Sequence, residues 1–213
     1  MEILVKDVSK IIKGVSILEN VNLELHGGMI YGLQGANGSG KTMLMRLVAG
    51  LIRPTSGNVF INGWMLGKDR DFPPSMGLLI ESPAFLPGYT GYKNLALLAS
   101  LRGIADIDQV RTAILDVGLD PNDPRKYRKY SLGMKQRLAI AAAIMEWPDL
   151  ILLDEPTNAL DDEGVRQICT LLRHERERGA LIIMACHDVS LLEGLADEIY
   201  TVIEGKIARK ATK

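Results

Sequence analysis

One glycine-rich segment limits the possible folds of this chain more than any other feature. It matches the pattern G-x-x-x-x-G-K-[ST] and reads Gly35-Ala36-Asn37-Gly38-Ser39-Gly40-Lys41-Thr42. Glycines let backbone N–H groups turn towards phosphate oxygens, and a helix that follows such a loop points its positive end at the same anion. The lysine is a cation for the β- and γ-phosphates, and the threonine hydroxyl can ligate Mg²⁺. We predict that all of these residues bind the phosphates of a nucleotide.

The residues on either side of this loop have the pattern that phosphate binding requires. Residues 29–34 form a short apolar run, which predicts a strand. After the loop, apolar residues recur with the spacing of a helix, at Leu44, Leu47, Val48 and Leu51. A glycine-rich turn that binds nothing is the alternative interpretation. The order strand, loop, helix favours phosphate binding over that alternative.

A second apolar run ends in two acidic residues. Residues 150–153 predict a buried strand, and Asp154 and Glu155 follow it directly. Asp154 could hold Mg²⁺ through water, and Glu155 could act as a general base on an attacking water. A strand that merely ends in solvated acids is the alternative. The phosphate loop favours the functional interpretation, because ligands of such sheets gather at the carboxyl ends of the strands.

The remaining pattern predicts an α/β fold. Strands are expected near both ends of the chain, and helices and strands alternate after residue 150. Residues 94–102 and 106–117 have helical patterning, and no convincing strand lies between about residues 81 and 131. We therefore expect a P-loop NTPase core with a mostly parallel sheet, an N-terminal antiparallel β region and an inserted helical lobe.

These elements predict one domain over residues 1–213, with its core at about 1–80 and 135–213 and the lobe at about 81–134. The formal net charge of −1 gives no reason to expect a nucleic-acid partner. The two cysteines, Cys169 and Cys186, suggest no disulfide framework and thus a reducing compartment. The first residues resemble no secretion signal, and the densest apolar run, 138–145, is shorter than the ~20 residues that span a bilayer. We expect a protein that is soluble or held at a membrane by a partner.

The segment before the second strand carries the resemblance to a known family. It reads Tyr130-Ser131-Leu132-Gly133-Met134-Lys135-Gln136-Arg137. It resembles the signature motif of ABC transporter ATP-binding subunits, which is usually Leu-Ser-Gly-Gly-Gln with Gln-Arg two residues further on. Ser131 and Gly133 are retained, whereas Tyr130, Leu132 and Met134 depart from the common form. Ser131 occupies a helix N-cap position, from which its hydroxyl and the Gly133 amide could face a γ-phosphate; an ordinary N-cap is the alternative.

The resemblance implies roles for further residues. The loop 156–161 resembles the family's segment after the catalytic glutamate, with Asp161 at a dimer-contact position, and His187 matches the histidine that contacts the γ-phosphate. By this resemblance the cofactors are ATP and Mg²⁺, and Glu155 and His187 are catalytic. The resemblance also implies that two identical chains form a head-to-tail dimer in which Ser131 and Gly133 complete the partner's site. The Cys186-His187 pair could suggest a thiol protease, but no orienting third group is evident.

Two positions depart from the family pattern. Glu81 stands where the family usually has a glutamine that ligates Mg²⁺, and a carboxylate binds hard cations more strongly. Together with the signature segment, Glu81 resembles the bacitracin- and lantibiotic-type exporters; a tolerated variant without a special role is the alternative. Near the N-terminus, Ile12 replaces the aromatic residue that stacks on adenine, which predicts weak discrimination between ATP and GTP.

The expected function is hydrolysis of ATP to power a separate transmembrane permease that exports peptides or antimicrobials. The chain would then lie in the cytoplasm, peripheral to the inner face of the cell membrane. Phe85, in an apolar loop, is the expected permease contact, with packing inside the lobe as the alternative. A soluble ABC-type ATPase without a transport role is a second hypothesis, and a regulatory module with little turnover is a third. The single phosphate loop and the lack of a heptad pattern disfavour the second, and Glu155 and His187 disfavour the third.

Overall fold

The computed structural model describes residues 1–81 and 84–210 of the chain. Its N-terminal part is an antiparallel sheet with the strand order β2-β1-β4-β5. The strands of this sheet are β1 Glu2–Ile12, β2 Val15–His26, β4 Ser56–Ile61 and β5 Trp64–Met65. The predicted N-terminal antiparallel region is therefore confirmed.

A second sheet of six strands has the order β10-β9-β3-β8-β7-β6, in which only β10 is antiparallel to its neighbour. Its strands are β3 Met29–Gln34, β6 Met76–Leu79, β7 Leu150–Asp154, β8 Leu181–Ala185, β9 Glu198–Ile203 and β10 Lys206–Lys210. The central strands are continuous apolar runs because both faces of a parallel sheet are covered. The predicted mostly parallel sheet is confirmed.

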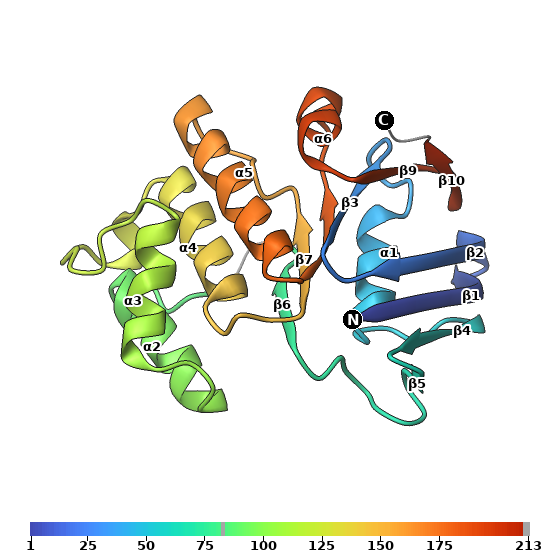
Figure 1. Cartoon of the computed structure of the whole chain (residues 1–213), viewed down its shortest axis with the longest axis horizontal. Coiled ribbons are helices and arrows are strands. Elements are labelled where there is room, and N and C mark those ends of the chain that lie inside the picture. Colours follow the sequence, from blue (N-terminus) through green and yellow to red (C-terminus); the bar gives the residue numbers. More distant parts are fainter. Residues whose placement is uncertain (82–83, 211–213) are drawn as a thin grey trace.

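Helices cover this sheet on both sides (Figure 1). The helices are α1 Lys41–Val48, α2 Gly91–Arg102, α3 Ile107–Asp116, α4 Leu132–Ile144, α5 Asp162–Glu177 and α6 Val189–Leu195, with a short 3-10 helix at Tyr127–Lys129. Successive residues of a strand point to opposite faces. Leu150 and Leu152 of β7 accordingly join the core shared by α1 and the antiparallel sheet, whereas Ile151 and Leu153 join the core beneath the other helices.

The helical lobe lies at one end of the molecule, where α2 and α3 pack with α4 (Figure 1). Thr90 caps α2, and Asp106 and Gln109 form a reciprocal capping box at the start of α3. The expected division of the chain at residue 134 falls inside α4, which runs from the lobe to the core, so that division stays a prediction. No helix in residues 1–81 and 84–210 is long and apolar enough to cross a membrane.

The strand β6 did not follow from the sequence pattern. Its four residues are too few to show a period, and the segment reads as part of the loop that leads to Glu81. Its strand character comes from parallel pairing with β7, from Met76 opposite Leu150 to Leu79 opposite Leu153. Pairing between strands so far apart in sequence is a tertiary effect.

Candidate functional site

The candidate site lies at the carboxyl ends of three adjacent strands. β8 lies between β3 and β7 and is parallel to both. The phosphate loop follows β3, Asp154 ends β7, and His187 follows β8. Because parallel strands end at a common edge, three distant stretches of sequence meet there.

The phosphate loop has the backbone conformation that its glycines allow. Gly38 and Gly40 have φ values of 77° and 115°, in the left-handed region. At Gly35 a Cβ atom would lie 2.3 Å from the carbonyl oxygen of Val202, so no side chain fits there. The Lys41 ammonium is buried and donates to the carbonyl oxygens of Gly35 at 2.7 Å and Ala36 at 3.1 Å. Among the described residues, no side chain caps the first turn of α1, so its N–H groups are available to an anion.

Thr42 and Asp154 contact each other across the sheet edge. The Thr42 hydroxyl donates to Asp154 Oδ2 at 2.6 Å. A hydroxyl oxygen beside a carboxylate is a set of hard oxygen donors, which suits Mg²⁺. The residues present at this position therefore fit the expected metal.

Glu155 and His187 form a second polar pair at the same edge. His187 Nε2 lies 3.0 Å from Glu155 Oε1, and the His187 amide donates to Oε2 at 3.4 Å. Oε1 is buried, and within residues 1–81 and 84–210 no donor, His187 Nε2 included, has hydrogen-bond geometry towards it. Burial raises the pKa of the Glu155 carboxyl above its ordinary value, and the neighbouring His187 opposes that rise.

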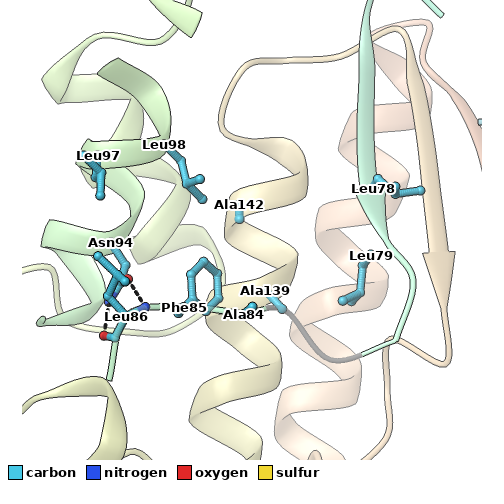
Figure 2. Close-up of a pocket in the computed structure, with 10 residues that line it drawn as sticks. All are labelled: Leu78, Leu79, Ala84, Phe85, Leu86, Asn94, Leu97, Leu98, Ala139 and Ala142. Carbon is cyan, nitrogen blue, oxygen red and sulfur yellow. Dashed lines mark hydrogen bonds between the residues drawn. The ribbon is translucent and has the colours of Figure 1, made fainter. Parts of the chain in front are cut away.

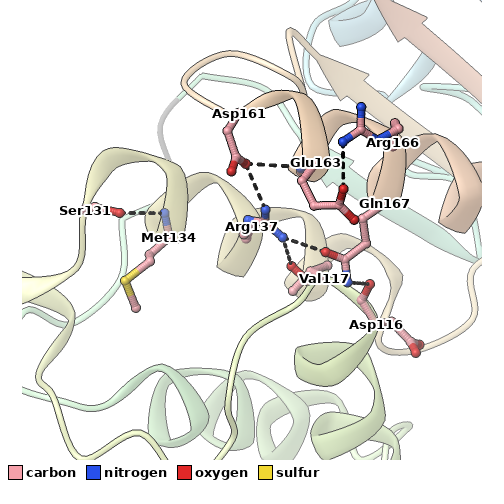
Figure 3. Close-up of polar contacts among 10 residues, drawn as sticks. Asp116, Val117, Ser131, Met134, Arg137, Asp161, Glu163, Arg166 and Gln167 are labelled. Carbon is pink, nitrogen blue, oxygen red and sulfur yellow. Dashed lines mark hydrogen bonds and ion pairs between the residues drawn. The ribbon is translucent and has the colours of Figure 1, made fainter.

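Ser131 and Gly133 lie at the start of α4, on the other side of the parallel sheet from α1. The Ser131 hydroxyl accepts the Met134 amide at 3.2 Å, so this residue is the N-cap that the sequence predicted (Figure 3). The structure thus gathers the phosphate loop, Asp154, Glu155 and His187 at one edge. Ser131 and Gly133 begin α4, which covers the opposite face of the parallel sheet from α1.

Glu81 pairs with Arg46 of α1 through its carboxylate. The side chain of Glu81 is 69% exposed, and its metal role stays a prediction. The sequence reasoning missed Arg46, although a signal was present: it follows Thr42 by four residues and so lies on the same face of α1.

The turn between β9 and β10 contacts the phosphate loop, which the sequence reasoning also missed. The Gly205 amide donates to the Ser39 carbonyl at 3.0 Å, and the Gly205 carbonyl accepts the Glu19 amide at 2.9 Å. Glu204 and Gly205 form this turn, and no local sequence pattern reveals which loop it contacts. Ile12, the residue in place of the aromatic that stacks on adenine in the family, ends β1 and is 38% exposed.

Asp161 is the N-cap of α5 and contacts the α4 residue Arg137 (Figure 3). Arg137 Nη2 lies 3.3 Å from Asp161 Oδ1. Arg137 Nη1 donates to the carbonyl of Val117 and to Gln167 Oε1, both at 2.7 Å. This guanidinium connects the end of α3 in the lobe with the loop that follows Glu155.

An apolar groove of about 310 Å³ lies between the lobe and the core. Figure 2 shows its lining: Leu78, Leu79, Ala84, Phe85, Leu86, Asn94, Leu97, Leu98, Ala139 and Ala142. The Asn94 side chain holds the loop, because its Oδ1 accepts the Leu86 amide at 2.7 Å and its Nδ2 donates to the Leu86 carbonyl at 3.2 Å. The Phe85 ring lines the groove and also packs edge-on against Tyr127, with ring centres 5.2 Å apart.

Comparison with known proteins agrees with this geometry. Residues 18–158 match the sequence model of the family described as ABC transporter. YybJ of Bacillus subtilis (strain 168), described as an uncharacterized ABC transporter ATP-binding protein, is 44% identical over 95% of this chain and 93% of its own length. The bacitracin transport ATP-binding protein BcrA of Enterococcus faecalis is 40% identical over 92% of this chain but 64% of its own length. The lantibiotic transport ATP-binding protein SrtF of Streptococcus pyogenes is 35% identical over 90% of this chain and 82% of its own length.

Solved structures have the same fold. An ATP-binding subunit of an ABC transporter superposes with a TM-score of 0.89 at 24% identity, covering 99% of this chain and 90% of that one. The dimeric MJ0796 cassette superposes with a TM-score of 0.88 at 24% identity, covering 99% of both chains. This chain belongs to the ABC transporter family, as an ATP-binding subunit with ATPase activity.

Proposed function

We propose that this chain hydrolyses ATP to power a separate transmembrane permease, and that the permease exports peptides or antimicrobial compounds. The observation that carries the proposal is the gathering of the phosphate loop, the Thr42–Asp154 pair and the Glu155–His187 pair at one edge of the parallel sheet. The names of BcrA and SrtF, which refer to bacitracin and lantibiotic transport, support the choice of substrate class. The chain would work at the inner face of the cell membrane.

In the proposed reaction, the backbone N–H groups of residues 35–40 and the Lys41 ammonium bind the β- and γ-phosphates. Mg²⁺, when held at Thr42 and Asp154, would neutralise charge on the phosphate oxygens. Glu155 accepts a proton from the attacking water through its carboxylate. His187 orients that carboxylate and contacts the γ-phosphate. Glu81 is a further proposed metal ligand, and its pairing with Arg46 competes with that role.

The proposed assembly is a head-to-tail dimer of this chain. α1 and α4 cover opposite faces of the parallel sheet, and Ser131 and Gly133 lie at the start of α4. A second copy would bring them to the γ-phosphate, as the resemblance implies. Ser131 is exposed and free to take part in such a contact.

The apolar groove beside Phe85 is the proposed docking site for the permease. Leu97 and Leu98 line it and are 41% and 37% exposed, although large apolar side chains are usually covered. A short helix with apolar residues could fill it. Residues 84–86 line this groove and follow Glu81 closely in sequence, which would let nucleotide binding and permease movement influence each other.

Detergent extraction of a tagged chain from its native membranes tests this proposal. We expect a polytopic membrane protein to co-purify near stoichiometry, and Leu98→Glu to lower its recovery at least tenfold. Leu115→Glu is the matched control, because Leu115 is 57% exposed on α3 and lies outside the groove. Recovery of soluble partners alone would favour an ABC-type ATPase without a transport role. Equal losses in both variants would contradict the groove as the docking site.

A further inference from the structure

Gln136, in the first turns of α4, contacts the backbone of the proposed catalytic glutamate. Its Nε2 donates to the carbonyl oxygen of Glu155 at 3.0 Å and to that of Pro156 at 3.1 Å. Both partners are carbonyl oxygens, which only accept hydrogen bonds. The amide nitrogen of residue 136 must therefore face them, and a carboxylate at this position could not replace it.

The backbone that Gln136 holds has an unfavourable conformation. Glu155 has a φ of 51°, in the left-handed region that side-chain-bearing residues rarely adopt. Such a conformation persists only where surrounding contacts impose it. The Glu155 amide donates to the Ala185 carbonyl at 2.9 Å, and the Glu155 carbonyl also accepts the Asn158 amide at 3.3 Å. Hydrogen bonds thus restrain the peptide groups on both sides of the Glu155 Cα atom.

α4 packs closely against the same loop at a second point. A Cβ atom on Gly133 would lie 2.8 Å from the carbonyl oxygen of Ala159. Ala159 itself has a φ of 64°. The start of α4 therefore supports the loop after β7 at both of its left-handed residues. The Gln136 side-chain amide contacts Glu155, and the Gly133 backbone approaches Ala159 closely.

We propose that Gln136 is a positioning residue for ATP hydrolysis. It holds the Glu155 backbone in the left-handed conformation that directs the carboxylate towards His187 and the attacking water. The inference rests on the proposed role of Glu155. Gln136 has no contact with Lys41, Thr42 or Asp154 among the hydrogen bonds of the described residues, so its loss should slow the chemical step and leave ATP binding intact.

Two substitutions of Gln136 test this role in the purified full chain. Gln136→Met keeps the length but removes the donor, and Gln136→Glu places an acceptor against two carbonyl oxygens. Gln109→Glu is the matched control, because a glutamate in the α3 capping box can still accept the Asp106 amide. We expect kcat to fall about 10–100-fold in both Gln136 variants, since a misplaced catalytic group costs up to about 10²-fold. KM and the directly measured Kd for ATP should stay within about threefold of wild type, and Gln109→Glu should behave as wild type.

Parallel measurement of Glu155→Gln separates this inference from the function it rests on. Wild-type kcat in both Gln136 variants, with an inactive Glu155→Gln, would overturn the role of Gln136 alone. Wild-type turnover in Glu155→Gln would overturn the catalytic assignment of Glu155 and the inference with it. Loss of ATP binding or of the folded state in both Gln136 variants would make Gln136 a structural residue and would also overturn the proposal.

Discussion

At the scale of single residues, Glu155 is constrained in both its side chain and its backbone. Its side chain is 18% exposed, its backbone is left-handed, and its Oε1 lies beside His187. Burial makes the ionised form costly and raises the pKa of the carboxyl, and His187 lowers the pKa by a smaller amount. A base with a raised pKa retains a stronger affinity for the proton of an attacking water.

This raised pKa makes stability depend on pH. The folded chain binds the Glu155 proton more tightly than the unfolded chain does. The stabilisation of the folded state that comes from this tighter binding is fully present below the pKa of the unfolded chain. It is lost as pH rises through the pKa of the folded chain. We expect Glu155→Gln to melt at a higher temperature than wild type at pH 8, with a difference that shrinks towards pH 4. Each ~1 kcal/mol of difference in the free energy of unfolding would shift Tm, measured by scanning fluorimetry, by about 2–4 °C.

The control for this measurement is Glu163→Gln. Glu163 is in the first turn of α5, where its side chain is 75% exposed and pairs with Arg166. Its substitution should not give a stabilisation that grows with pH. An equal difference between wild type and Glu155→Gln at both pH values would contradict the burial argument.

At the scale of elements, the phosphate loop depends on a turn far along the chain. Gly205 joins β9 to β10 and hydrogen-bonds both Ser39 and the β2 residue Glu19. Its φ is 78°, and a Cβ atom there would lie 2.5 Å from the carbonyl oxygen of Ile17. A side chain at this position would therefore clash with the β2 backbone and push away the turn that contacts the phosphate loop.

Gly205→Ala should weaken both folding and ATP binding. Gly63→Ala is a closely matched control, because Gly63 has a φ of 81° and its Cβ would meet nothing within 4 Å. Gly63→Ala should lose only the ~1–2 kcal/mol of a left-handed alanine and bind ATP as wild type does. Gly205→Ala should lose more, and its Kd for ATP by titration calorimetry should rise several-fold. Equal behaviour of the two variants would show that the turn does not support the loop.

At the scale of the whole molecule, the parallel sheet separates two groups of functional residues. The phosphate loop leads into α1 on one face, and Ser131 begins α4 on the other. In the proposed head-to-tail dimer, a nucleotide bound at the phosphate loop of one chain would meet the signature residues of the second chain.

Complementation between two defective chains tests this arrangement. Lys41→Ala should abolish phosphate binding, and Ser131→Arg should block the signature surface, so each variant alone should retain less than about a hundredth of wild-type ATPase activity. In the mixture, a heterodimer has one site with an intact loop and an intact partner signature, so part of the activity should return. A mixture as inactive as its components would contradict the trans arrangement.

Much of the fold could be predicted from the sequence because the signals were local. The loop glycines, the period of α1 and the apolar run of β7 depend on residues close in sequence. The N-cap position of Ser131 is local for the same reason, and Ser131 is an N-cap in the structure. The N-cap role of Asp161 was not predicted. The phosphate loop and the acids after β7 were recognised on this basis, and their chemical roles stay predictions.

Only the tertiary structure decided which of these segments meet. The strand order β3-β8-β7 brings His187 to Glu155, and no local pattern specifies that order. The contact of Arg46 with Glu81 and the hydrogen bonds of Gln136 to the Glu155 loop likewise join residues from different elements. The sequence by itself determined the class of site and the positions of its elements, since spacing and turn chemistry act within a few residues. Long-range strand pairing and helix packing decided the rest, because burial across the sheet selects among partners that are distant in the chain.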